Sequence, residues 1–310
     1  MVNELKSFAK INLGLEITGK RPDGFHNLKT IFQTVDVFDT ITIKENRSGS
    51  ITLSGDDKSV EWDESNTIMK AFDAIYKNYD VKKGFDLFVE KRIPAGSGLG
   101  GGSSNAAVIL LYLNEYFKLE LTLDDLIDIG AKIGADVPFF LMGGTVLARG
   151  IGEKMTPLED KEEKHVHIAV PDINVSTRLI FSRFNLTSKP IKSKIDTFMK
   201  SQDYRILENN LEKITFELFP KVGVIKEKMR ALYYDLVLMS GSGSAVYGLT
   251  DTQVCPDLKN RFAGADINVF VTRTIGRQNY FDRIGAWPSG KAPVFGAGIR
   301  RFESSRPRNP

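Results

Sequence analysis

The chain has 310 residues, of which 42% are hydrophobic and 26% charged, as is ordinary for a soluble globular protein. No apolar run reaches the roughly 20 residues that a membrane-spanning helix needs. The formal net charge is +3, but residues 287–310 hold five Lys and Arg and one acid, so the rest of the chain carries 37 basic and 38 acidic residues. A neutral body of this kind argues against a nucleic-acid-binding protein.

Cysteine and histidine are scarce. The single cysteine, Cys255, excludes an intrachain disulfide and a cysteine-based metal cluster. With only three histidines, the sequence also argues against a zinc site formed by protein side chains. The N-terminus lacks the long apolar core and cleavage site of a signal peptide, so we expect a cytoplasmic chain.

Strand patterns dominate the first 155 residues. An alternating strand over residues 6–18 carries Lys10 and Asn12, and a Pro-Asp-Gly turn follows it at residues 20–26. Further strands are predicted over residues 28–37, 40–44, 50–53, 85–89 and 145–148. Amphipathic or apolar patterns predict helices over residues 66–79, 106–117 and 122–133, the last with Thr122 as its N-cap.

A charged run at residues 159–164 marks an expected boundary between a domain of residues 1–155 and a second of residues 156–284. In the second, strands are predicted over residues 165–170, 236–239, 245–249 and 268–272, and helices over residues 176–184, 203–218, 222–233 and 256–262. Because strands and helices intermingle without strict βαβ alternation, we predict the α+β class.

A glycine-rich loop lies between the strand at residues 85–89 and the helix at residues 106–117. Its glycines are free to adopt positive φ, and the N–H groups at a helix N-terminus favour an anion. We therefore predict a phosphate-binding loop rather than a flexible surface turn. The loop residues are Pro94, Ala95, Gly96, Ser97, Gly98, Leu99, Gly100, Gly101, Gly102, Ser103 and Ser104.

Two common phosphate-binding motifs fit this loop poorly. A P-loop needs a lysine after its last glycine, whereas Ser103 follows Gly102. The spacing G-x-G-x-x-G is present, but the βαβ context and the acidic residue about 20 positions later that a dinucleotide site requires are missing.

Three other motifs accompany the loop: Lys-Ile-Asn-Leu at residues 10–13, Gly-Ala-Asp-Val-Pro at residues 134–138 and Ser-Gly-Ser-Gly-Ser at residues 240–244. The set resembles the GHMP kinases, whose ATP-binding motif P-x-x-x-G-L-G-[SG]-S-S is similar to residues 94–104, with one additional glycine before the two serines. The resemblance implies ATP and Mg²⁺ as cofactors. It also implies an N-terminal domain like ribosomal protein S5 domain 2, a ferredoxin-like C-terminal domain, and an irregular tail.

Within that family, residues 9–13, 20–26 and 134–140 are similar to members that phosphorylate the 2-hydroxyl of an alcohol carrying a cytidine diphosphate group, on the route to isoprenoid precursors. The similarity spans residues 8 to 276. It implies a small-molecule substrate, no nucleic acid or membrane partner, and a monomer or weak homodimer. A GHMP kinase for another small alcohol, or a nucleotide-binding protein without activity, is the alternative.

The resemblance places the catalytic pair at Asp136 and Lys10. Asp136 would accept the proton of the attacking hydroxyl, and Lys10 beside it would keep that carboxylate ionised. Asn12 shares the strand face of Lys10 and would bind the substrate. The structural alternatives are a helix-end aspartate bonded to nearby amides, an outward-facing lysine, and a surface asparagine.

Four residues are expected at the cytosine ring and its phosphates. The resemblance assigns Phe25 and His26 to one side of the ring, and Phe181 with Thr177 to the other. The family usually has tyrosine where this chain has Phe25, so stacking would persist without the hydroxyl. Core packing of Phe181 and a structural role of His26 are the alternatives.

Serines complete the predicted phosphate contacts. Ser103 and Ser104 would bind phosphate, with a hydroxyl near Mg²⁺, although N-capping is the alternative. Gly241 and Ser242 would lie beside the substrate phosphates, unless residues 240–244 are only a turn between strands.

Residues 287–310 lie beyond the resemblance and show no helical or strand period. Arg301-Phe302-Glu303-Ser304 matches an in-frame translation of a tRNA T-arm sequence. We interpret the basic, unstructured tail at residues 285–310 as read-through into a tRNA gene; an RNA-binding arm is the alternative.

Overall fold

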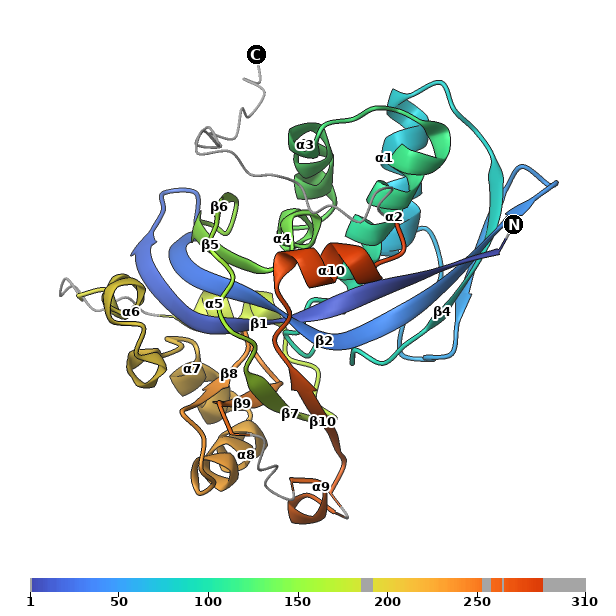
Figure 1. Cartoon of the computed structure of the whole chain (residues 1–310). Helices are drawn as coiled ribbons and strands as arrows, with labels where there is room; N and C mark the ends of the chain where they lie inside the picture. The colour runs from blue at the N-terminus through green and yellow to red at the C-terminus, as the bar shows by residue number, and fades with distance from the viewer. Residues whose placement is uncertain (1, 185–191, 253–257, 264, 287–310) are drawn as a thin grey trace.

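Two antiparallel-rich sheets organise the chain (Figure 1). The structure, a computed structural model, describes residues 2–184, 192–252, 258–263 and 265–286. The six-stranded sheet has the order β3-β4-β2-β5-β6 with β1 paired to β2, and the four-stranded sheet has the order β10-β7-β9-β8. This mixture confirms the predicted α+β class. No helix in the described ranges is long and apolar enough to cross a membrane.

A long antiparallel pair, β1 and β2, forms the middle of the first sheet. Its register shifts between Phe8 and Ala9, where two additional residues of β2 form a bulge opposite β1. Because of this bulge, β2 continues as one strand, whereas the sequence predicted two strands, at residues 28–37 and 40–44. The strands are β1 Val2–Lys20, β2 His26–Asn46, β3 Ile51–Gly55, β4 Gly84–Glu90, β5 Thr145–Gly150 and β6 Lys154–Pro157.

Four helices pack together over the first sheet. The central one, α2, is buried through most of its length, because residues 104–113 are apolar or small on every face. Thr122 and Asp125 form a capping box at the start of α3, as the Thr122 prediction requires. The helices are α1 Thr67–Asn78, α2 Gly101–Phe117, α3 Leu123–Ile133 and α4 Val137–Met142.

The second sheet shares a core with β1. Ile11 and Leu13 of β1 belong to the same buried cluster as Ile168, Leu238 and Tyr247. Its strands are β7 His165–Pro171, β8 Leu236–Met239, β9 Val246–Thr250 and β10 Ile267–Arg273. The accompanying helices are α5 Thr177–Arg183, α6 Lys194–Ser201, η1 Tyr204–Ile206, α7 Glu212–Leu218, α8 Pro220–Arg230 and α9 Leu258–Arg261.

The helix predicted over residues 203–218 is wrong in its middle. Residues 207–211 separate η1 from α7 and run beside β1, where the Leu15 N–H donates to the Glu208 carbonyl at 2.9 Å and the Asn210 N–H donates to the Leu15 carbonyl at 2.9 Å. These tertiary backbone bonds replace the local helical bonds that the sequence pattern favours.

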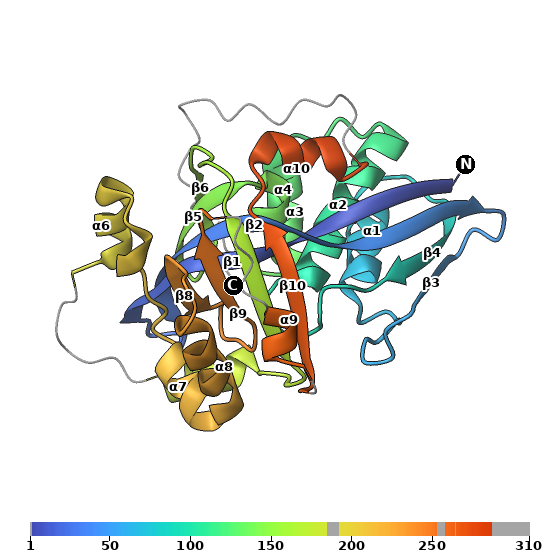
Figure 2. The same ribbon diagram turned by 60° about the horizontal axis from the view of Figure 1, so that its bottom comes forward.

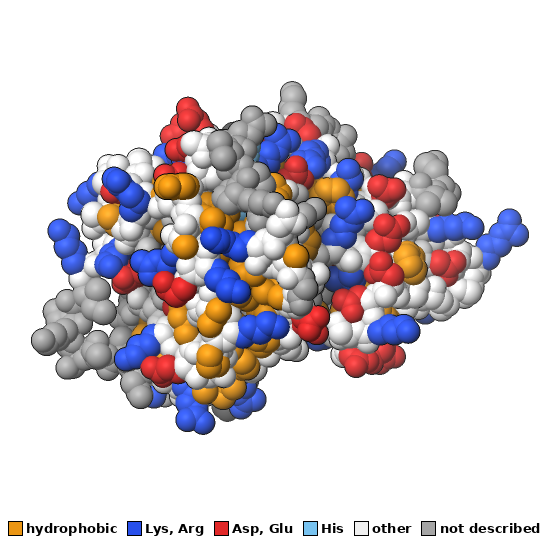
Figure 3. Space-filling model, turned by 90° about the horizontal axis from the view of Figure 1, so that it is seen from below, with side chains coloured by type: hydrophobic (Ala, Val, Ile, Leu, Met, Phe, Trp, Pro, Cys, Tyr) orange, Lys and Arg blue, Asp and Glu red, His pale blue; other side chains and the backbone are white. Residues whose placement is uncertain are grey.

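A last helix, α10 (Arg277–Arg283), was not predicted. It lies beside α4 and β1 in both ribbon views (Figures 1 and 2), where Tyr280 packs edge-on against Phe8 and donates its hydroxyl to the Phe140 carbonyl at 2.6 Å. The chain thus returns to the first sheet's core after completing the second sheet. The division into residues 1–155 and 156–284 stays a prediction. On the face drawn in Figure 3, acidic and basic side chains are interspersed.

Candidate active site

The glycine loop joins β4 to α2 and needs glycine at particular positions. Gly96, Gly98 and Gly100 have φ of +64°, +81° and +78°. A Cβ on Gly98 would lie 2.3 Å from the Ser240 carbonyl oxygen. The loop is therefore packed directly against the second glycine-serine segment, and a side chain at residue 98 would force the two apart.

A cavity of about 370 Å³ opens over this loop. Gly100 caps α2 without a side-chain hydrogen bond, so the first N–H groups of that helix are available to an anion. The cavity is lined by nine of the predicted loop residues, Pro94, Ala95, Gly96, Ser97, Gly98, Gly100, Gly101, Gly102 and Ser103.

The remaining two loop residues are placed differently. Leu99 is fully buried, and its carbonyl accepts the backbone N–H of Lys10 at 2.9 Å. The hydroxyl of Ser104 is buried without a hydrogen-bond partner among the described residues. Ser97 lines the cavity, but its hydroxyl already donates to the Pro94 carbonyl at 2.6 Å.

Lys10 of β1 and Asp136 before α4 come together although they are far apart in the sequence. The Lys10 ammonium lies 3.6 Å from Asp136 Oδ2, and the lysine is 3% exposed. Asp136 precedes α4, yet within the described chain its carboxylate does not cap that helix. The two structural alternatives, an outward-facing lysine and an aspartate used as a helix cap, therefore do not describe these side chains.

The surroundings of Lys10 are polar on one side and aromatic on the other. Its ammonium donates to Asn12 Oδ1 at 2.8 Å and lies 5.2 Å from the centre of the Phe32 ring. Burial lowers the pKa of Lys10, and the charge of Asp136 partly opposes that shift. Asn12 is itself held by donation to Thr30 Oγ1 at 2.8 Å.

A second cavity, of about 190 Å³, is lined by both members of the pair and by Asn12. Gly241 and Ser242 form its opposite wall, and a Cβ on Gly241 would lie 3.7 Å from the Lys10 ammonium nitrogen. Asp136 and Gly98 line this cavity as well as the one over the glycine loop, so the two are neighbours.

A third cavity, of about 790 Å³, holds the predicted base-binding residues Phe25, His26, Thr177 and Phe181. The His26 and Phe181 rings lie 5.9 Å apart, and Phe25 is 57% exposed. Burial, with the nearby charge of Lys20 as a second cause, lowers the pKa of His26, which favours the neutral ring at pH 7. Its Nε2 is buried without a partner among the described residues.

Thr177 and Phe181 line both the second and third cavities. The Thr177 hydroxyl also lies 2.8 Å from that of Ser242. The three cavities therefore form a row: glycine loop, Lys10 and Asp136, then the aromatic side chains.

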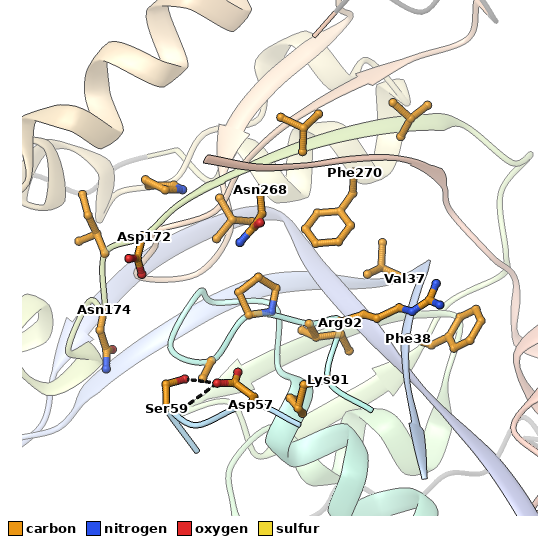
Figure 4. A pocket seen from close by; sticks show the side chains of 18 of the residues that line it. Val37, Phe38, Asp57, Ser59, Lys91, Arg92, Asp172, Asn174, Asn268 and Phe270 are labelled. Carbon is orange, nitrogen blue, oxygen red and sulfur yellow. Dashed lines mark hydrogen bonds between the residues drawn. The ribbon is translucent and has the colours of Figure 1, made fainter. Parts of the chain in front are cut away.

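A fourth cavity, a groove of about 800 Å³, lies between residues 91–95 and β10 and shares Lys91, Ile93, Pro94 and Ala95 with the lining of the loop cavity (Figure 4). Several of its polar groups are already bonded within the chain. Asp57 accepts the Ser59 N–H at 2.8 Å, Asp36 accepts from Arg283 at 2.6 Å, and Lys91 is paired with Asp39. With these groups occupied, and with Lys10 and Asp136 absent from its lining, the groove is a poorer candidate for phosphoryl transfer.

Seven residues of the loop cavity were not predicted from sequence: Val60, Trp62, Asn66, Thr67, Lys91, Ile93 and Asn105. Lys91, Ile93 and Asn105 lie within three residues of the loop, and this nearness was the one signal that the sequence offered. The other four come from the segment that leads into α1, and the packing of α1 against α2 brings them to the cavity.

Comparisons with known proteins agree with this arrangement. The model of the GHMP kinases N terminal domain matches residues 66–144. The chain is 39% identical over 282 residues to 4-diphosphocytidyl-2-C-methyl-D-erythritol kinase of Exiguobacterium sibiricum, covering 89% of this chain and 99% of the relative. It is 37% identical over 284 residues to the enzyme of that name from Clostridium beijerinckii, covering 88% and 100%.

Solved structures give the same result for the fold. The crystal structure of a 4-(cytidine 5'-diphospho)-2C-methyl-D-erythritol kinase superposes with a TM-score of 0.71 at 32% identity, covering 88% of this chain and 100% of that one. A mevalonate kinase superposes with a TM-score of 0.65 at 17% identity, covering 88% and 99%. The latter likeness concerns the fold alone.

Proposed function

The chain belongs to the 4-diphosphocytidyl-2-C-methyl-D-erythritol kinases within the GHMP kinases, and we propose that its row of three cavities holds ATP, the reacting groups and the cytidine end of the acceptor in that order. The enzyme transfers a phosphoryl group from ATP to 4-diphosphocytidyl-2-C-methyl-D-erythritol, at the 2-hydroxyl, in the formation of isoprenoid precursors. The observation that carries the assignment of residues is the position of Lys10 and Asp136 where the ATP and acceptor cavities meet.

Asp136 is the proposed base. Its carboxylate lines both the nucleotide cavity and the acceptor cavity, so a hydroxyl in the second can reach it while facing a phosphate in the first. Lys10 stabilises the ionised carboxylate and the negative charge that develops during transfer. The hydroxyl attacks the γ-phosphorus directly as its proton passes to Asp136, and no covalent enzyme intermediate is required.

The acceptor is proposed to extend from Asn12 to the aromatic cavity. Asn12 and the segment around Gly241 and Ser242 hold its alcohol and phosphate groups, and Phe25 and Phe181 contact the cytosine ring. The buried, unpartnered Nε2 of His26 supplies a directional bond to that ring.

Mg²⁺ would neutralise the phosphates of ATP when it is bound. Among the described residues no group of three or more His, Cys, Asp or Glu side chains could hold a metal by itself. The cavity-lining Ser103 nevertheless offers a hydroxyl oxygen as a ligand at the phosphate end, whereas the hydroxyl of Ser104 is buried outside the cavity lining. This lining fits a Mg²⁺ that is held mainly by the nucleotide. We further propose that the protein is a monomer or a weak homodimer.

A coupled assay of ADP release tests the substrate assignment. Purified protein is given ATP and, separately, 4-diphosphocytidyl-2-C-methyl-D-erythritol, mevalonate or homoserine. We expect ADP release with the cytidine compound and not with mevalonate or homoserine. Equal or greater release with mevalonate or homoserine would contradict the substrate assignment. No ADP release with any of the three acceptors would contradict the proposed kinase function.

A further inference from the structure

Asn209 does not line any of the three cavities, yet its side chain hydrogen-bonds to the backbone that forms one wall of the acceptor cavity. It is 4% exposed and follows η1 in the segment that runs beside β1. Its amide nitrogen donates to the carbonyls of Met239 and Gly241, at 2.8 and 2.7 Å. Its amide oxygen accepts the Leu211 N–H at 2.9 Å. Both N–H donors of the amide are therefore used on the glycine-serine segment.

The same short stretch of chain is fastened to β1. The Leu15 N–H donates to the Glu208 carbonyl at 2.9 Å, and the Ile17 N–H donates to Asn210 Oδ1 at 3.0 Å. Since β1 also carries Lys10 and Asn12, residues 208–210 connect the two walls of the acceptor cavity.

Two residues in the first turns of helix α7 also hydrogen-bond to the backbone of residues 239–242. Glu212 Oε1 accepts the Met239 N–H at 2.9 Å, and Thr215 donates its hydroxyl to the Ser242 carbonyl at 3.1 Å. Glu212 is balanced by an ion pair with Lys226 at 2.5 Å. The backbone at residues 239–242 is thus held by three side chains, Asn209 from the segment before α7 and Glu212 and Thr215 from α7 itself.

We propose that Asn209 is a positioning residue for the acceptor. By holding the Gly241 carbonyl away from the cavity, it turns the antiparallel N–H of the same peptide, which belongs to Ser242, toward the acceptor's anionic groups. It also fixes Gly241 opposite Asn12, where a Cβ on Gly241 would lie 3.4 Å from Asn12 Oδ1. The inference rests on the proposed function, because it takes the cavity lined by Gly241 and Ser242 as the acceptor site.

The test is the kinetics of Asn209→Asp, which keeps the side-chain shape and the acceptor for Leu211 but replaces two N–H donors with an oxygen facing two carbonyls. We expect the KM of the acceptor to rise about 10-fold or more, with the KM of ATP changed less than about twofold. Thr215→Val, which removes the bond to Ser242 at nearly constant volume, should shift the same KM in the same direction by a smaller factor.

Asn210→Ala is the matched control, because it removes a comparable bond to Ile17 without touching residues 239–242. Melting temperatures of all variants are measured alongside. If Asn209→Asp does not fold, Thr215→Val and Asn210→Ala give the comparison. Equal changes in both KM values, or the same acceptor effect in Asn210→Ala, would overturn the inference. A wild-type protein that does not use the cytidine substrate would instead overturn the proposed function.

Discussion

The Lys10 ammonium lies 3.6 Å from the Asp136 carboxylate, although one residue belongs to the first strand and the other to the loop before α4. The strand buries the lysine and the loop leaves the aspartate open to both cavities. This relationship gives the proposed site a charged pair where the loop cavity and the second cavity meet.

Replacing Asp136 with asparagine should remove the proton acceptor while keeping the size of the side chain. We expect kcat to fall by about 100-fold or more, with the dissociation constant of ATP nearly unchanged. Single-turnover kinetics and nucleotide titration measure the two quantities. Asp128→Asn, at an exposed position of α3, is the control. Turnover close to wild type in Asp136→Asn would exclude the carboxylate as the base.

The activity should decline at alkaline pH because Lys10 must be protonated. Burial lowers the pKa of Lys10 below its ordinary value of 10.5, so the ammonium is lost as pH rises through that lowered pKa. A profile of kcat/KM against pH should therefore fall before pH 10.5, while circular dichroism shows that the protein is still folded. A rate that stays level up to pH 10.5 would show that the charge on Lys10 is dispensable.

Phe25 should contribute to binding of the cytidine end without affecting ATP. Its ring is more than half exposed and lies at the mouth of the aromatic cavity with His26. Because stacking on a base contributes about 1–3 kcal/mol, Phe25→Ala should raise the KM of the acceptor by about 5- to 150-fold. Phe25→Tyr should keep the stacking and stay near wild type. The control is Phe88→Ala, an exposed aromatic on β4, and an equal effect there would count against a role in binding.

Alanine at Gly98 should damage the nucleotide site through a backbone clash. The residue has φ of +81°, and its new Cβ would lie 2.3 Å from the Ser240 carbonyl oxygen. Gly49→Ala introduces comparable left-handed strain at φ of +75° with nothing within 4 Å. Strain alone costs about 1–2 kcal/mol. We expect Gly98→Ala to lose considerably more stability than Gly49→Ala and to weaken ATP binding, as measured by thermal melting and nucleotide titration. Similar losses in both would show that the clash is relieved.

Two truncated chains should distinguish the contribution of α10 to stability from that of the residues that follow it. Tyr280, Phe281 and Ile284 are almost completely buried, and Ala286 is 4% exposed. A chain ending at Gly276 loses these core contacts, and removal of one buried large side chain already costs about 3–5 kcal/mol. It should melt far below the full chain or fail to fold. A chain ending at Ala286 should keep full activity and melting temperature. Residues 287–310 lie outside the described residues. A loss of activity or melting temperature in the second variant would show that they have a role, which would contradict the read-through interpretation.

The parts of the fold and site that were predicted are those carried by local sequence. Alternation identified the strand of Lys10, the Thr122 cap marked the start of α3, and the glycines of residues 96–100 indicated a loop with positive φ angles. The meeting of Lys10 with Asp136 came from resemblance, since no local pattern reports a contact between residues so distant in the chain.

What was missed depends on tertiary contacts. Residues 207–211 have a helical pattern but form backbone bonds to Leu15 instead. The short helix α10 is specified by burial of Tyr280 and Phe281 in the core of the first sheet, whose last strand, β6, ends at Pro157. Trp62 lines the nucleotide cavity because its segment folds back over the loop, and no spacing in the sequence indicates that.

The most direct test is a crystal structure with a non-hydrolysable ATP analogue and the cytidine substrate bound together. The account predicts the γ-phosphate over the glycine loop, the 2-hydroxyl within hydrogen-bond reach of Asp136, and Lys10 beside both. The cytosine ring should lie between Phe25 and Phe181. An acceptor hydroxyl remote from Asp136, or a γ-phosphate bound away from the glycine loop, would contradict it.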